Sequence, residues 1–138
     1  MKIFTISDVE FIVSRLAKEM MDFNEPIPNF STRFATKLES CLAAPFQTFS
    51  KKALYKGLTG KAAMLFYLMI KNHPFQNGNK RIAMTTLLTF LYVNKKWLRV
   101  DTQELYNFAM WVAQGPASVK QEIIVSIEKF IKRYLIKA

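Results

Sequence analysis

The stretch His73-Pro-Phe-Gln-Asn-Gly-Asn-Lys-Arg81 lies between two long apolar runs and sets the organisation of the chain. It contains the single histidine of the sequence and one of its four glycines. Upstream, residues 58–72 predict a helix that ends at Asn72, because Pro74 disfavours the helical conformation at the residue before it. Downstream, a second apolar helix is predicted from about Lys80 to Tyr92. Both are apolar almost all round, so we expect two buried helices that share an end at this stretch.

The turn between these helices predicts an anion site. A turn rich in Gly and Asn that opens into a helix points unpaired N–H groups at the positive end of the helix dipole, where phosphates bind. Gly78 allows a positive φ and close approach of the backbone to a ligand, and Asn79 tolerates the left-handed conformation. Lys80 and Arg81 oppose the dipole at about 0.3 to 1 kcal/mol each, which favours an anion beside them.

His73 is the candidate proton carrier, because an unperturbed imidazole titrates near neutral pH. A single histidine at a helix end is more often structural than catalytic. The phosphate-type turn that follows within nine residues favours the catalytic interpretation.

The positive charge is concentrated around the same stretch. The chain carries 20 basic and 10 acidic residues, a net charge of +10. Between Glu39 and Asp101 there are ten basic residues and no acidic one, so this segment holds all the excess. Such a field would attract a polyphosphate or an acidic protein. Nucleic acid is the rival partner, but no recognisable binding module is present, and we expect no specific nucleic-acid binding.

The totals predict one domain over residues 1–138, with 51% hydrophobic residues. Its class is all-α, with about six helices. We expect no signal peptide and no membrane span, because no apolar run is long enough. The single cysteine, Cys41, cannot form an internal disulfide, which favours the cytoplasm and a buried structural thiol.

The remaining helices follow from start and stop signals. Ser7 and Glu10 predict a capping box and a first helix to about Phe23; a second helix starts at Ser31 or Thr32 and ends before Pro45. Residues 46–55 favour a short hairpin or an irregular flap over a helix, and the alternative to a binding role for them is an ordinary surface loop with aromatic anchors. Residues 95–100 are predicted as a connection. Asp101 and Glu104 predict a second capping box, and two further helices are predicted, to about Ala113 and from Ser118, separated by Gly115 and Pro116.

His73-Pro-Phe-x-x-Gly-Asn-Lys-Arg81 resembles the signature of the Fic/Doc family, and Lys80 is similar to its Doc (death-on-curing) branch. The segments 37–45, 61–67 and 89–94 are also similar to the Doc pattern. The resemblance implies a Fic/Doc-like helical bundle with a short flap before the motif. It implies that Phe46, Gln47, Thr48, Phe49 and Ser50 dock the target segment.

The resemblance also implies roles for the motif. His73 would be the general base that takes a proton from a target hydroxyl, Phe75 a core anchor, and the residues Asn77, Gly78, Asn79, Lys80 and Arg81 the phosphate cradle, with Lys80 and Arg81 also supporting catalysis. Members that transfer AMP have glycine at position 80 and commonly a second arginine at position 84, where this chain has Lys80 and Met84. The lysine implies transfer of the terminal phosphate of ATP to a Ser or Thr hydroxyl, with elongation factor Tu as target; AMP transfer is the alternative.

Position 77 departs from the pattern. The family has Asp or Glu there, where the carboxylate helps to hold Mg²⁺; Asn77 offers an amide oxygen without charge. Three outcomes stay open: metal held mainly by ATP phosphates and Asn77, lysine-dominated catalysis with weak metal need, or a catalytically impaired binding module. The segment Ser118 to Glu122 has the first spacing of a self-inhibitory helix, but Ile123 breaks the pattern. A separate Phd-like antitoxin, small and acidic, is therefore implied as a partner.

Overall fold

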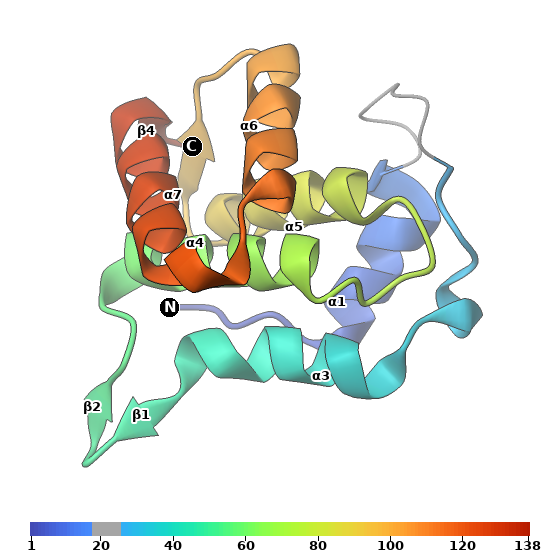
Figure 1. Ribbon diagram of the computed structural model, residues 1–138, viewed down its shortest axis with the longest axis horizontal. Coiled ribbons are helices and arrows are strands. Elements are labelled where there is room, and N and C mark those ends of the chain that lie inside the picture. Colours follow the sequence, from blue (N-terminus) through green and yellow to red (C-terminus); the bar gives the residue numbers. More distant parts are fainter. Residues whose placement is uncertain (18–25) are drawn as a thin grey trace.

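The computed structural model describes residues 1–17 and 26–138. It confirms the all-α class: these residues form six α-helices, α1 and α3 to α7, together with short turns and two small antiparallel pairs of strands (Figure 1). Helix α4 (Gly57–Lys71) contacts α3, α5, α6 and α7, so it is the centre of the packing. None of the helices in the described ranges combines the length and apolar character that a bilayer crossing requires.

Helices α4 and α5 (Asn79–Val93) form the predicted buried pair. Their apolar residues point in all directions, and nearly every side chain between Gly60 and Ile70 is buried. A helix without a polar face must be covered on all sides, which is why the other helices pack around these two.

The first helix, α1 (Ile6–Phe11), starts two residues earlier than predicted. Thr5 is the N-cap, and its side chain and that of Asp8 form the capping box. The predicted box of Ser7 and Glu10 is therefore wrong, although both pairs have the same spacing. A π-helical segment, η1 (Ile12–Leu16), continues α1; the predicted end at Phe23 lies outside the described residues.

The second helical region is divided into three. A 3₁₀ turn η2 (Phe30–Thr32) precedes α3 (Ala35–Ala43), and a second 3₁₀ turn η3 (Ala44–Phe46) contains Pro45. The predicted hairpin is confirmed as β1 (Thr48–Phe49) paired antiparallel with β2 (Lys52–Ala53). Ser50 and Lys51 both have positive φ, as a two-residue hairpin turn requires.

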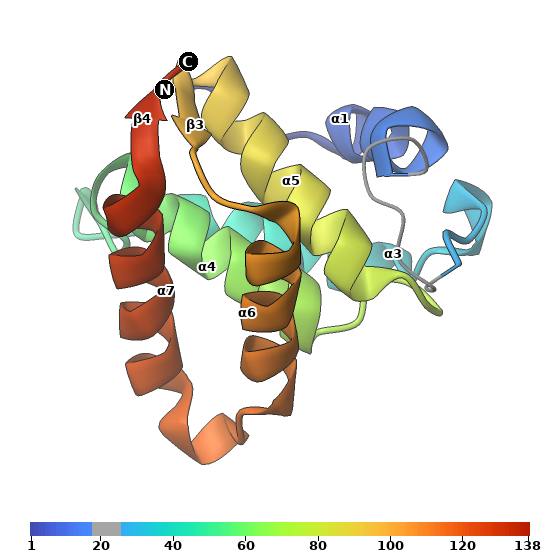
Figure 2. The same cartoon turned by 90° about the horizontal axis from the view of Figure 1, so that it is seen from above.

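The C-terminal half contains an element that was not predicted. Strand β3 (Lys96–Leu98) lies in the predicted connection and pairs antiparallel with β4 (Leu135–Lys137). Between them are α6 (Thr102–Gln114), the 3₁₀ turn η4 (Ala117–Val119) and α7 (Lys120–Tyr134), which lie on the same side of α4 (Figure 2). Asp101 is the N-cap of α6, but Glu104 does not complete a box: its carboxylate accepts a 2.5 Å hydrogen bond from the Tyr134 hydroxyl.

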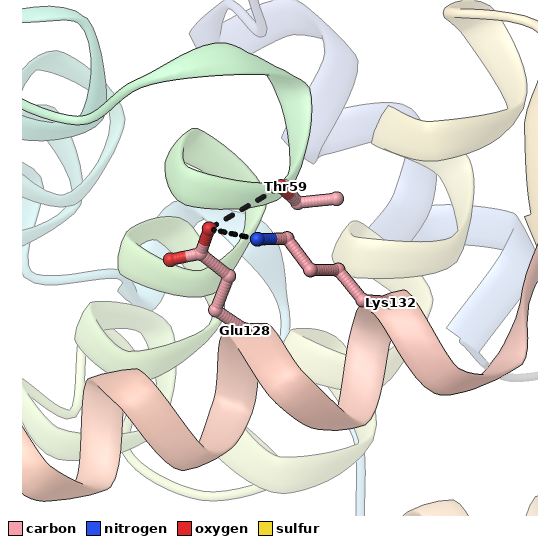
Figure 3. Close-up of polar contacts among 3 residues, drawn as sticks. All are labelled: Thr59, Glu128 and Lys132. Atoms are coloured by element: carbon pink, nitrogen blue, oxygen red, sulfur yellow. Dashed lines mark hydrogen bonds and ion pairs between the residues drawn. The ribbon is translucent and has the colours of Figure 1, made fainter.

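A polar contact fixes the N-terminal end of α4 against α7. The Glu128 carboxylate of α7 accepts a 3.4 Å hydrogen bond from the Thr59 hydroxyl of α4 and pairs with Lys132 at 3.1 Å (Figure 3). The opposite, C-terminal end of α4 leads to His73.

Candidate functional site

His73 follows α4 in a left-handed conformation, with φ of 47°. Its side chain is exposed. A non-glycine residue in this region costs about 1 to 3 kcal/mol and persists only where its surroundings hold it there, and such residues concentrate at functional sites. The backbone therefore turns sharply at the residue predicted to carry the proton.

Two sets of hydrogen bonds hold the segment after His73. The Phe34 N–H donates to the Pro74 carbonyl at 2.9 Å, which ties the segment to the start of α3. The Asn79 side chain accepts from the Phe75 N–H at 3.1 Å and donates to the Phe75 carbonyl at 2.9 Å. Phe75 is 1% exposed, which confirms it as a core anchor, and Asn79 is 8% exposed. We call this pair of bonds the Asn79 clamp; both join the Asn79 side chain to the Phe75 backbone.

Gly78 is the N-cap of α5 in the left-handed conformation, with φ of 71°. A glycine is needed here because other atoms of the protein lie close to its Cα. A Cβ at position 78 would lie 2.6 Å from the Pro26 carbonyl oxygen and 3.2 Å from Ile27 Cδ1. Among the residues that the structure describes, no side chain caps α5, and the first hydrogen bond within the helix runs from the Ile82 N–H to the Gly78 carbonyl, at 2.9 Å. The start of α5 thus has the uncapped character that anion binding uses.

A cavity of about 380 Å³ opens beside His73. We call it the His73 cavity. Its lining contains His73 and four predicted residues of the turn, Asn77, Gly78, Asn79 and Lys80. It also contains three residues that were not predicted from the sequence, Ile70, Tyr106 and Ala113. A smaller cavity of about 150 Å³ continues along α6 and is lined by Lys80, Met110, Ala113 and Gln114. Another, of about 340 Å³, lies between α1 and residues 28–33 and contains none of the motif.

Arg81 lies outside this lining. It is 7% exposed, and its Nη2 donates to the Ala17 carbonyl at 2.5 Å. Its side chain therefore points from α5 toward the end of η1, and Lys80 is the cation that lines the cavity. This location supports a structural contribution from Arg81 more than contact with a phosphate.

The flap does not reach the His73 cavity. Strands β1 and β2 precede α4 while His73 follows it, so the two lie at opposite ends of this helix (Figures 1 and 2). Fifteen helical residues separate them by about 22 Å. Gln47, Thr48 and Ser50 are exposed, as is Phe49 at 74%, but Phe46 packs on Phe90 with ring centroids 5.9 Å apart.

The cavity offers little to a metal ion by itself. Asn77 is exposed and contributes a neutral oxygen, and no described residue of the lining is a carboxylate. Across the two described ranges, no three His, Cys, Asp or Glu side chains group as metal ligands would. A hard cation could be held here only with oxygens supplied by a ligand such as a polyphosphate.

The buried thiol of Cys41 belongs to the packing, as predicted. It is 0% exposed, and its Sγ donates to the Leu68 carbonyl of α4 at 3.4 Å. Desolvation by burial raises the pKa of Cys41 to about 11, so the thiol is protonated at neutral pH and is no nucleophile.

Comparison with known proteins identifies the family of the chain. The model of the Fic/DOC family matches residues 3–91, which include the flap, α4 and the whole motif. Toxin Doc of Mycolicibacterium smegmatis (strain ATCC 700084 / mc(2)155) is 36% identical over 64 residues, which are 46% of this chain and 49% of that protein. The alignment thus spans about half the length of this relative. No solved structure matches the chain. The match over the greater part of the chain shows that it belongs to the Fic/DOC family.

Proposed function

We propose that this chain is a Doc-type toxin that transfers the terminal phosphoryl group of ATP to a Ser or Thr hydroxyl of a protein, and so arrests translation. The observation that carries the proposal is the His73 cavity. One space of about 380 Å³ is bordered by an exposed imidazole, the uncapped start of α5 and the Lys80 side chain. A proton acceptor, a phosphate site and a cation are the groups that such a transfer needs.

The reaction follows from these positions. A ring nitrogen of His73 takes the proton of the target hydroxyl. The oxygen forms a bond to the γ-phosphorus of ATP while the bond from that phosphorus to the β–γ bridging oxygen breaks, so ADP leaves. The amides at the start of α5 and the Lys80 ammonium stabilise the charge that develops on the phosphoryl oxygens. Arg81 supports the step indirectly, by fixing α5 to the Ala17 carbonyl.

Magnesium enters this proposal as part of the substrate, MgATP. Because the described lining has Asn77 but no carboxylate, the phosphates supply most of the ligands and Asn77 one oxygen at most. Metal dependence should then follow the affinity of ATP for Mg²⁺.

The target and the regulator are also proposals. The excess positive charge of residues 40–100 suits an acidic protein such as elongation factor Tu, and a Phd-like acidic antitoxin would neutralise the toxin. The cytoplasm is the compartment that contains ATP and this target. A target segment held at the flap would need about seven extended residues to cover the 22 Å to His73.

The test compares two labels in the same reaction. With purified elongation factor Tu, label from γ-labelled ATP should appear on the target and label from α-labelled ATP should not. His73→Ala should abolish transfer while the far-UV circular dichroism spectrum and the urea midpoint stay close to those of the wild type. Transfer of the γ label by His73→Ala at the wild-type rate would refute the assignment of the base.

A second candidate is a nucleotidyl transferase or a catalytically impaired binding module. The lack of a carboxylate in the described lining favours the impaired module. Label from α-labelled ATP on the target would establish AMP transfer. No label from either ATP, with elongation factor Tu or antitoxin still bound by both wild type and His73→Ala, would establish the binding module.

A further inference from the structure

We propose that Lys71 is a positioning residue that holds the α6 wall of the His73 cavity at the distance a nucleotide needs; the inference rests on the function proposed above. Its Nζ donates to the Ala113 carbonyl at 3.0 Å and to the Gly115 carbonyl at 2.6 Å. Lys71 is the last residue of α4, two positions before His73, and its acceptors lie at the end of α6. One side chain thus joins the element that presents the imidazole to the element that forms the opposite wall.

The acceptors are well suited to an ammonium group. The last carbonyls of a helix lack partners within the helix and lie at the negative end of its dipole, where a cation is stabilised. Lys71 satisfies two such groups of α6 from a partly buried position.

The acceptors are also fixed in place. A Cβ on Gly115 would lie 2.3 Å from Ile123 Cδ1, so the turn after α6 packs directly on the buried Ile123 of α7. Because the Gly115 carbonyl cannot shift freely, the two bonds of Lys71 fix the spacing of α4 and α6 at this end.

Ala113 both accepts a hydrogen bond from Lys71 and lines the proposed nucleotide site. It lines both the His73 cavity and the smaller cavity beside Lys80, so a displacement of its helix end changes the width of both. The segment directly after His73 is held by other groups, the Asn79 clamp on Phe75 and the bond from Phe34 to Pro74. Loss of the Lys71 tie should therefore weaken nucleotide binding while the proton acceptor keeps its position.

The experiment compares Lys71→Met, which keeps the length and removes the donors, with Lys71→Arg, which keeps the charge and N–H donors. The matched control is Thr59→Val, which removes the polar contact at the other end of α4 (Figure 3). For Lys71→Met we expect a KM for ATP raised about tenfold with kcat changed less than threefold. Lys71→Arg should recover KM to within about threefold, and Thr59→Val should leave it unchanged.

Equilibrium binding of a fluorescent ATP analogue gives a readout that needs no transfer. Its Kd should rise about tenfold in Lys71→Met, also in a His73→Ala background. If the wild type transfers neither label, the proposed function fails, and this Kd still decides the role of Lys71. An unchanged Kd and KM in Lys71→Met, or equal rises in Lys71→Met and Thr59→Val, would overturn the inference.

Discussion

Replacement of Gly78 by alanine tests the site at its most constrained position. Its φ of 71° costs an alanine about 1 to 2 kcal/mol, offset by about 0.4 to 1 kcal/mol because alanine restricts the unfolded chain. The new Cβ would also lie 2.6 Å from the Pro26 carbonyl oxygen and 3.2 Å from Ile27 Cδ1. Overpacking of this kind adds about 1 to 3 kcal/mol. The free energy of unfolding should fall by about 1 to 5 kcal/mol in total.

Gly57 provides the matched control. It has a nearly identical φ of 66°, at the start of α4, but a Cβ there meets nothing within 4 Å. Gly57→Ala should therefore lower the free energy of unfolding by only about 1 kcal/mol, so the difference between the two variants isolates the contact with Pro26 and Ile27.

Urea denaturation followed by circular dichroism measures both effects. With a slope of about 2 kcal/mol per molar urea, the midpoint should fall by about 0.5 M for Gly57→Ala and by about 0.5 to 1.5 M more for Gly78→Ala. The nucleotide analogue should bind more weakly to Gly78→Ala alone. Equal midpoints for the two variants would show that residues 26–28 yield without cost, and would refute the argument from close approach.

Three further outcomes are expected. Asn79→Ala removes both bonds of the Asn79 clamp and leaves the buried Phe75 N–H without its acceptor, so thermal or urea unfolding should show a loss of about 1 to 3 kcal/mol; a loss below 0.5 kcal/mol would contradict the clamp. His73→Gly should abolish transfer yet raise the free energy of unfolding by up to about 1 kcal/mol relative to His73→Ala, because glycine relieves the φ of 47°; equal stabilities would contradict the strain. Burial raises the pKa of the Cys41 thiol from its ordinary value of 9.0 to about 11, so between these two pH values the folded state keeps a proton that the unfolded chain loses. The contribution of this thiol to stability is therefore complete below pH 9 and is lost as the pH rises toward 11. Unfolding measured across this window should show a slope steeper by up to about 1.4 kcal/mol per pH unit in the wild type than in Cys41→Ala, and identical slopes would contradict it.

Much of the frame around His73 could be predicted from local signals. Pro74 and Asn72 place the end of α4, and the helix that follows the Gly78 turn starts within one residue of its predicted position. These features depend on backbone preferences of neighbouring residues, which a sequence displays directly. The flap hairpin was predicted for the same reason, since its turn needs no distant partner.

The features that sequence reasoning missed depend on partners far along the chain. Strand β3 has three residues and pairs with a strand nearly forty residues later, so neither segment shows an alternating pattern long enough to detect. Tyr106 is one aromatic residue in an amphipathic helix, and nothing in its spacing distinguishes it from core residues. Lys71 reads as an ordinary basic residue in a last helical turn until α6 supplies its two acceptors.

The predicted cradle shows the same limit within the motif. Lys80 and Arg81 are neighbours with the same charge, but consecutive residues of a helix point about 100° apart. Packing decides which one meets the cavity: Lys80 lines it, while Arg81 reaches the Ala17 carbonyl. The spacing alone gave both the same role.

The position of the flap at one end of α4 fixes the distance between the flap and His73 at the other end. If β1 and β2 grip a substrate while His73 activates its hydroxyl, α4 sets how many residues must separate the gripped segment from the acceptor. Short peptides that contain the acceptor alone would then react slowly however well their sequence matches, and longer ones would gain sharply once they span the helix. Selectivity among cellular proteins would come from the geometry of an unfolded or looped stretch as much as from the residues beside the acceptor.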